Sequence, residues 1–295
     1  MRPLLPAEPS VADGIAGHGI SCHGMSRHGM SWRIHRERVL LAGWGRAILL
    51  QIAHPKVARG VAEHSGFTTE PWGRLRRLRR TLDAMLALTF GSEEEAAAVA
   101  ARINAIHDRV HGRLEEAGGD AAAGASYSAH DPELLTWVHA TLVESFLLAY
   151  RLFVGPVTAA EADRYCVEAS GIEPALGIPP GRLPRSEAQL RGYLDAMLAS
   201  GVIEVTDTAR RLSRDLLAPP APRIVRPALW LAALPAVGLL PPAIRAGYRI
   251  PWDARRERAL RIVAGAARTG LPLVPPRLRY WAVARRAERR ARSGR

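Results

Sequence analysis

The sequence predicts an all-α protein built as a single multi-helix domain. Alanine, leucine and arginine, which favour helices, dominate the composition, and β-branched residues are sparse outside short runs. Apolar residues recur at helical spacing along most of the chain, and no alternating apolar and polar run of strand length is present. The 295 residues are enough for one large domain with a buried core.

Three helices are predicted in the first third of this domain. Residues 38–53 form an apolar helix that ends before Pro55, because the residue preceding a proline avoids the helical conformation. Residues 57–63 form a short helix. Residues 75–90 form a longer one, with Gly91 placed as its C-cap.

Capping residues mark the helices that follow. Ser92 precedes three glutamates, so it starts a helix that runs from residue 93 to about residue 116. Asp131, followed by a proline, starts a helix that continues to about residue 153. Thr158 with Glu161 forms a capping box that starts a helix at 159–170, and Ser186 caps another at 187–199. A further helix is predicted at 206–217.

The two ends of the chain differ from the domain between them. Residues 1–35 form an arm rich in histidine and glycine, with three copies of a five-residue repeat, and we expect it to be disordered and to hold no site. The all-α domain is predicted at 36–285. Residues 286–295 form a basic tail, which is either a solvated helix end or a contact for an anionic membrane.

The formal net charge of +13 comes almost entirely from arginine, since Lys56 is the only lysine. Zinc-finger spacing and interleaved basic and aromatic residues are absent, so we expect no nucleic-acid partner. Cys22 and Cys166 are the only cysteines, which excludes a disulfide framework. The N-terminus has no signal-peptide pattern, so the expected location is cytoplasmic, with membrane association left open.

Residues 228–244 carry no charged side chain across seventeen positions. This run is shorter than the ~20 residues of a transmembrane helix, and three prolines interrupt it. A buried hairpin in the core is the first interpretation. A peripheral membrane contact, in which one apolar face lies on the lipid, is the second.

His107 and His111 are the most informative pair of residues in the chain. On a continuous helix, residues four apart share one face, and Ile103, Ile106 and Val110 would surround this pair with an apolar stripe. A neutral imidazole among aliphatic side chains suits a haem ligand or a ligand of a bare metal ion. It also suits a core histidine that only makes hydrogen bonds, so the spacing leaves all three roles open.

Other polar side chains are weaker candidates. His139 lies two turns into its predicted helix and could be the neighbour of a ligand, a substrate contact or a core residue. Arg77 and Thr81 share a helix face, where the arginine could pair with the carboxylates of a haem. His54 and His64, the latter preceded by Glu63, flank a short helix and could supply a base. Phosphate-binding loops, nucleophile elbows and HExxH motifs are absent, which argues against the hydrolase, kinase and dinucleotide-binding classes.

A series of short motifs occurs in a fixed order along the chain. The motifs are the segment 51–65, Arg77 with Thr81, Phe90-Gly91, His107-x-x-Val110-x-Gly112, Tyr127-Ser128-Ala129, the segment 131–141, Leu239-Leu240-Pro241 with Arg245, and Leu273-x-Pro275-x-x-Leu278-Arg279. Together they resemble the MpaB-like family of oxygenases, which includes the latex-clearing rubber oxygenases and the fungal endoplasmic-reticulum-bound oxygenase of mycophenolic acid synthesis. The resemblance spans roughly residues 36–285.

The resemblance implies a globin-like core around haem b, in which a histidine followed three residues later by valine is the proximal iron ligand. That pattern falls on His107, which makes His111 a neighbour of the ligand. The family's arginine and threonine beside the haem fall on Arg77 and Thr81. Where rubber oxygenases carry a distal lysine, this chain has Arg80, which does not readily lose its proton to bind iron. The distal ligand and the substrate are therefore left open.

The function that the resemblance implies is that of a haem-dependent oxygenase, which uses dioxygen on an apolar, isoprenoid-like unsaturated substrate. Arg80, Glu63 and His64 are its predicted catalytic residues. His139 and Thr141 would shape the pocket or orient bound oxygen.

Two other functions stay open. One is a non-haem metal oxidoreductase, in which His107 and His111 bind the metal together with an acid such as Glu144 or Glu168. The other is a non-enzymatic helical protein that binds lipid or lies on a membrane surface. The sequence does not predict an oligomeric state.

Overall fold

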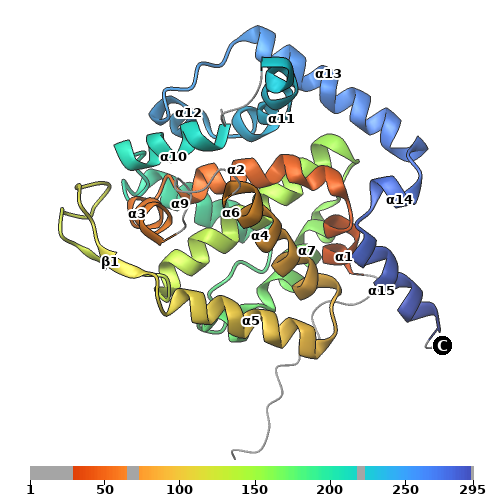
Figure 1. Ribbon diagram of the computed structural model, residues 1–295, viewed down its shortest axis with the longest axis horizontal. Helices are drawn as coiled ribbons and strands as arrows, with labels where there is room; N and C mark the ends of the chain where they lie inside the picture. Colours follow the sequence, from red (N-terminus) through yellow and green to blue (C-terminus); the bar gives the residue numbers. More distant parts are fainter. Residues whose placement is uncertain (1–28, 65–72, 218–222, 294–295) are drawn as a thin grey trace, which may run out of the picture.

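Helices pack around one long central helix, α6 (Pro132–Phe153), as Figure 1 shows. The computed structural model describes residues 29–64, 73–217 and 223–293, and within them the chain is mostly helical, as predicted. The elements before α6 are α1 (Met30–His35), η1 (Arg38–Leu40), α2 (Leu41–Gln51), α3 (Pro55–His64), α4 (Gly73–Phe90), α5 (Glu93–His107), β1 (His111–Arg113) and β2 (Ser126–Ser128). The elements after it are α7 (Ala159–Ser170), α8 (Glu173–Leu176), α9 (Glu187–Ala199), α10 (Asp207–Leu217), η2 (Arg223–Val225), α11 (Arg226–Gly238), α12 (Pro242–Gly247), α13 (Ala254–Gly270), η3 (Leu271–Leu273), α14 (Pro276–Arg279) and α15 (Ala282–Ser293).

The sequence of α6 explains its central place. The Asp131 side chain accepts a hydrogen bond from the Glu133 backbone N–H, and Pro132 occupies the first turn, so the helix starts where predicted. Buried apolar side chains, among them Trp137 and Phe146, recur along its length. A helix this apolar is stable only when other elements cover it, and α1, α2, α7, α9 and α13 all contact α6.

Two glycines let α2 approach its neighbours closely on two sides. A Cβ atom on Gly43 would lie 2.7 Å from the Ser145 carbonyl oxygen of α6. A Cβ atom on Gly45 would lie 2.7 Å from the Ala236 Cβ of α11. Both positions therefore require glycine, and α2 lies tightly packed between α6 and α11.

The helix predicted at 93–116 is shorter in the structure, where α5 ends at His107. The following residues turn and form β1, which pairs antiparallel with β2. The prediction of a chain without strands is therefore wrong at this point. Strands of three residues are too short for an alternating pattern to show in a sequence.

The described part of the predicted N-terminal arm is folded and buried. Residues 30–35 form α1, and the backbone N–H groups of Met30 and Ser31 donate to the buried Glu168 carboxylate of α7 at 2.9 and 2.6 Å. The domain therefore begins earlier than the predicted boundary at residue 36. The three histidine-glycine repeats, predicted to lie in a disordered arm, fall mostly outside the described part of the chain.

The C-terminal segment closes over the N-terminal one on the right of Figure 1. Arg279 of α14 forms a two-pronged ion pair with Glu37, with nitrogen–oxygen distances of 2.6 and 2.9 Å, and Glu37 is 1% exposed. Ala287 of α15 is buried in a cluster with Phe90 of α4. The segment 286–295, predicted as a separate basic tail, is in its described part the second half of a packed helix.

Residues 228–244, predicted as a buried hairpin, fall on α11 and α12. The second half of α11 is buried through Leu234 and Val237, so the prediction is correct there. In the first half of the helix, Trp230 and Leu231 are exposed, so the prediction is wrong for these residues. No helix in the described ranges combines the length and the apolar character needed to cross a membrane.

His35 connects α1 with two other helices. Its Nδ1 lies 2.9 Å from the Thr89 hydroxyl of α4, and its Nε2 lies 2.8 Å from the Tyr165 hydroxyl of α7. The Thr89 hydroxyl donates to the Met85 carbonyl, so His35 Nδ1 donates to Thr89 and Nε2 accepts from Tyr165. Burial, with a smaller effect of nearby His139, lowers the pKa of His35 to about 3.

We predict that this histidine makes the protein less stable in mild acid. The pKa in the folded state lies below the ordinary value of 6.5, so the folded chain binds fewer protons than the unfolded chain. The stabilising contribution is complete above pH 6.5 and falls as the pH drops toward 3. Between pH 7 and pH 5, the free energy of unfolding in urea should fall by about 2 kcal/mol more in wild type than in His35→Gln. Equal losses in the two proteins would contradict the prediction.

Candidate functional site

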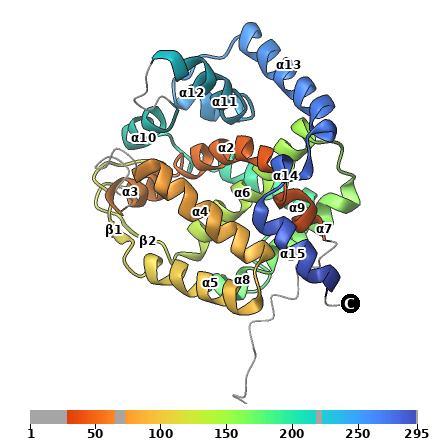
Figure 2. The same ribbon diagram turned by 45° about the vertical axis from the view of Figure 1, so that its right-hand side comes forward.

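His107 is the last residue of α5 and lies where this helix gives way to the β-hairpin. The helix begins with a capping box formed by Ser92 and Glu95. In both ribbon views, α4 and α5 meet near this box and spread apart toward the His107 end (Figures 1 and 2). One turn before His107, the Asn104 amide donates to the Ala175 carbonyl of α8 at 2.9 Å, which fixes this end of the helix.

The His107 ring is half-buried and neutral. Desolvation by burial lowers its pKa and nearby His130 lowers it further, while Asp108 raises it. The His107 Nδ1 atom is enclosed and has no hydrogen-bond partner within the described part of the chain. Enclosed polar atoms are normally bonded. A neutral imidazole with an unsatisfied, enclosed nitrogen therefore fits the role of an iron ligand.

His111 lies in a different environment from His107. It is an exposed residue of β1, because α5 ends four residues before it. The shared helix face predicted for this pair is therefore wrong. The two acids predicted to complete a bare-metal site also have other partners, since Glu168 caps α1 and Glu144 pairs with Arg46 at 2.7 Å.

Arg77, Arg80 and Thr81 all lie on α4, the neighbour of α5. The side chains of Arg80 and Thr81 are exposed, while that of Arg77 lies outside the described part of the chain. Along the backbone, Arg77 lies about as far before the turn between α4 and α5 as His107 lies after it. Arg77 and His107 therefore lie toward the same end of the helix pair. The haem contacts of Arg77, Arg80 and Thr81 stay a prediction.

His139 lies inside α6, beside α7. One of its ring nitrogens bonds the Ala169 backbone, and Nε2 is enclosed with no partner among the described residues. Burial lowers the pKa of His139 to about 4. Thr141 is fully buried, and its hydroxyl donates to the Val138 carbonyl of the same helix at 2.9 Å. The Thr141 hydroxyl therefore has a partner within its own helix, whereas His139 Nε2 has no partner among the described residues and could contact a ligand.

The structure brings Glu63 and His64 together with a third residue, Tyr127. The Tyr127 hydroxyl donates to Glu63 Oε2 at 2.5 Å, and His64 Nε2 lies 3.2 Å from that hydroxyl and 3.2 Å from the His111 carbonyl oxygen. The Tyr127 hydrogen bond, assisted by Arg59, lowers the pKa of Glu63. Burial and the Glu63 carboxylate raise the pKa of Tyr127. Glu63 is therefore an anion and Tyr127 a neutral donor at pH 7.

Two glycines make room for the ring of Tyr127. This tyrosine belongs to one of the sequence motifs, but the sequence predicts no functional role for it. A Cβ atom on Gly112 of β1 would lie 2.8 Å from the Tyr127 hydroxyl oxygen. One on Gly60 of α3 would lie 3.4 Å from the ring. Glycine at both positions is the signal in the sequence that a bulky group approaches the backbone. The ring holds the hairpin that follows His107 against α3.

We predict that Gly112→Ala destabilises the protein by about 1–3 kcal/mol, because the added methyl group displaces the Tyr127 ring. Gly192→Ala is the matched control, since a Cβ atom on this α9 residue would meet nothing within 4 Å. It should stabilise the protein by about 0.5–1 kcal/mol through helix propensity. Urea unfolding of both variants measures the effects, and two shifts of the same sign would contradict this packing of the ring.

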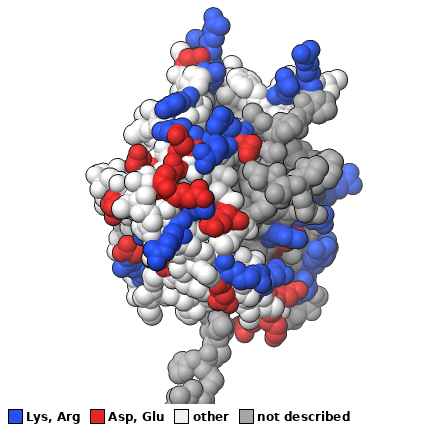
Figure 3. All heavy atoms as spheres, turned by 60° about the vertical axis from the view of Figure 1, so that its left-hand side comes forward, with Lys and Arg blue, Asp and Glu red and all other residues white. Residues whose placement is uncertain are grey.

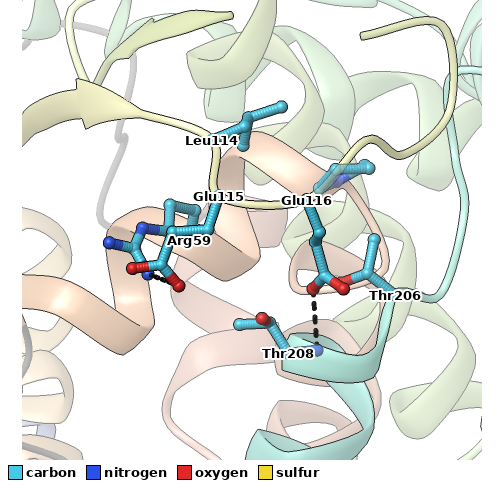
Figure 4. A pocket seen from close by; sticks show the side chains of 7 residues that line it. Arg59, Leu114, Glu115, Glu116, Thr206 and Thr208 are labelled. Atoms are coloured by element: carbon cyan, nitrogen blue, oxygen red, sulfur yellow. Dashed lines mark hydrogen bonds and ion pairs between the residues drawn. The ribbon is translucent and has the colours of Figure 1, made fainter. Parts of the chain in front are cut away.

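A small cavity lies beside this cluster, between α3, the segment after β1 and the start of α10 (Figure 4). Arg59 pairs with Glu115 at 2.7 Å, and Glu116 accepts a hydrogen bond from the Thr208 backbone N–H at 3.0 Å. The cavity of about 10 Å³ holds at most about one water molecule. The cavity lies between the hairpin and α10 and is too small for an organic substrate.

Figure 3 turns the left side of Figure 1 forward, where acidic and basic side chains lie next to one another.

A known family matches most of the chain. The model of the family described as "ER-bound oxygenase mpaB/B'/Rubber oxygenase, catalytic domain" matches residues 32–269. The chain belongs to this oxygenase family. The matched domain runs from α1 to the end of α13 and contains every predicted site residue.

Two mycobacterial proteins are similar to this oxygenase-family chain. They are the uncharacterized protein Rv2237 of Mycobacterium tuberculosis and the uncharacterized protein Mb2261 of Mycobacterium bovis. Each is 26% identical over 233 residues, which cover 78% of this chain and 88% of the relative. No solved structure matches the chain.

Proposed function

We propose that this member of the oxygenase family binds haem b through His107 and uses dioxygen to cleave a carbon–carbon double bond in an apolar, isoprenoid-like substrate. The observation that supports haem is the half-buried, neutral His107 ring with its enclosed, unsatisfied nitrogen. This residue lies within the matched oxygenase domain. Haem iron supplies the capacity to bind and activate dioxygen.

Several residues of the chain would hold the group in place. In the proposal, His107 binds the iron and Arg77 pairs with the carboxylates at the edge of the haem, which a guanidinium matches in a two-pronged geometry. Thr81 lies one helical turn from Arg77 on the same helix. His139 contributes its enclosed Nε2 to the surroundings of the substrate or of oxygen.

The predicted catalytic residues would differ in how they handle protons. The lowered pKa of Glu63 makes its carboxylate a weak proton acceptor. His64 Nε2 contacts the same Tyr127 hydroxyl that donates to Glu63, which in the proposal places the two predicted residues in one hydrogen-bonded group. In the proposal, the cationic guanidinium of Arg80 attracts negative charge and does not ligate iron.

The proposed reaction balances without an added reductant. One dioxygen molecule and one carbon–carbon double bond give two carbonyl groups, with one oxygen atom on each carbon. Oxygen uptake by the haem-supplemented protein should therefore occur with squalene, an isoprenoid with several double bonds, and not with squalane, its saturated analogue. Carbonyl products should appear in proportion to the oxygen consumed. Equal rates with both hydrocarbons, or oxygen uptake without carbonyls, would contradict the proposed reaction.

A further inference from the structure

The turn before α11 and the first half of this helix expose a group of large apolar side chains. Ile224 is 88% exposed, Trp230 48%, Leu231 43% and Val225 41%. We call these four residues the apolar tip. Exposed apolar residues scattered singly are ordinary, but these four lie within eight consecutive positions of one short element pair.

The remainder of α11 holds the tip in a fixed direction. Leu234 and Val237 in its second half are buried, and Ala236 lies against α2. Gly238 at its end is packed against Leu260 and Trp252, so that a Cβ atom there would lie 2.6 Å from each side chain. The inner half of the helix is therefore anchored in the core, while the outer half projects from the top of the molecule in Figure 2.

The segment that carries the tip is basic along the chain. Between Arg223 and Trp252 the chain contains no aspartate or glutamate, while Arg223 directly precedes the tip, Arg226 lies within its span, and both arginines are exposed. The first acid after this stretch, Asp253, already pairs with Arg256 at 3.4 Å. Figure 3 shows mostly basic side chains projecting from the top of the molecule, where Figure 1 places α11 and α13.

We propose that the apolar tip is a docking site for the surface of an anionic lipid bilayer. Tryptophan with aliphatic neighbours enters the boundary between headgroups and acyl chains. The two arginines add attraction to anionic headgroups. A second copy of the chain fits less well, because a symmetric contact through this tip would bring Arg223 and Arg226 of both copies together. Four side chains also fall short of the roughly 1,000 Å² of a stable protein interface.

Vesicle sedimentation tests this proposal with the full-length protein, and it does not depend on haem or on oxygenase activity. The vesicles are made of phosphatidylcholine alone or of phosphatidylcholine with phosphatidylglycerol. The test variant is Ile224→Ser with Trp230→Ser. The control is Val167→Ser, which removes a 49% exposed β-branched side chain from α7. Circular dichroism establishes that each variant keeps its helices.

Wild type and Val167→Ser should sediment with the anionic vesicles, less with the neutral ones, and less at high salt. The double variant should bind the anionic vesicles at least about tenfold more weakly. Absence of wild-type binding, or equal binding by the double variant, would overturn the proposal. Light scattering that shows dimers in wild type and monomers in the double variant, without vesicle binding, would overturn it in favour of self-association.

Discussion

Replacing His107 with alanine should remove haem from the purified protein while leaving the helices intact. Removing a residue that only hydrogen-bonds to a metal ligand already weakens metal binding by about 10–100-fold. Removing the ligand itself should weaken binding at least as much. The haem absorption band of His107→Ala should therefore fall more than about tenfold relative to wild type at equal protein concentration. Circular dichroism is expected to change little, because the ring lies at the end of α5 and is only half-buried.

His111→Ala is the matched control for this change. His111 is an exposed residue of β1, and no part of the proposed site needs its side chain. Its haem band should equal that of wild type. A band that survives in His107→Ala, or that is lost equally in the two variants, would show that the iron ligand is another residue.

Arg279→Ala should destabilise the protein far more than the loss of an ion pair on the surface. Glu37 is 1% exposed, and in the described structure Arg279 donates all three of the hydrogen bonds to its carboxylate, at 2.6, 2.9 and 3.1 Å. Removing the arginine leaves a buried carboxylate without its counter-charge, which costs about 3–5 kcal/mol. The expected result is a free energy of unfolding in urea that is lower by that amount. Partial recovery in the double variant Glu37→Gln, Arg279→Ala would show that the buried charge is the cause.

Arg182→Ala provides the comparison for an exposed pair. Arg182 and Glu133 lie 3.1 Å apart, with side chains 46% and 76% exposed. Water screens both groups, so the change should cost less than about 1 kcal/mol. A similar loss in Arg182→Ala and Arg279→Ala would mean that burial of Glu37 does not govern the stability of the C-terminal segment.

Most helix starts could be predicted from the sequence because they depend on neighbouring residues. The Ser92 and Thr158 capping boxes, the Asp131 cap and the Ser186 cap are all present in the structure. In each case the cap satisfies backbone N–H groups within three residues of itself, so the signal is local. The same caps explain why the start of the central helix is correctly predicted.

The end of α5 could not be predicted because its cause lies far along the chain. The Tyr127 ring packs against Gly60 and Gly112, and this contact joins segments that are distant in sequence. The apolar residues keep a helical spacing as far as His111, so the local sequence does not indicate the contact with Tyr127. For a similar reason the sequence does not predict the ordered position of α1, which is capped by Glu168 from α7.

The candidate site could be predicted in part. The resemblance to the oxygenase family, which rests on the ordered motifs around His107 and Asp131, is confirmed by the family match. The structure adds the contact between Glu63, His64 and Tyr127, which the sequence places in separate segments. The globin-like arrangement of the core, haem and the substrate remain proposals.

The haem content of the purified full-length protein decides whether this chain carries the proposed haem site. After expression with added haem, the pyridine haemochrome assay should give about one haem b per chain, with iron in equal amount. Protein that is folded by circular dichroism but holds neither haem nor iron, even after incubation with haem, would contradict the proposed haem site.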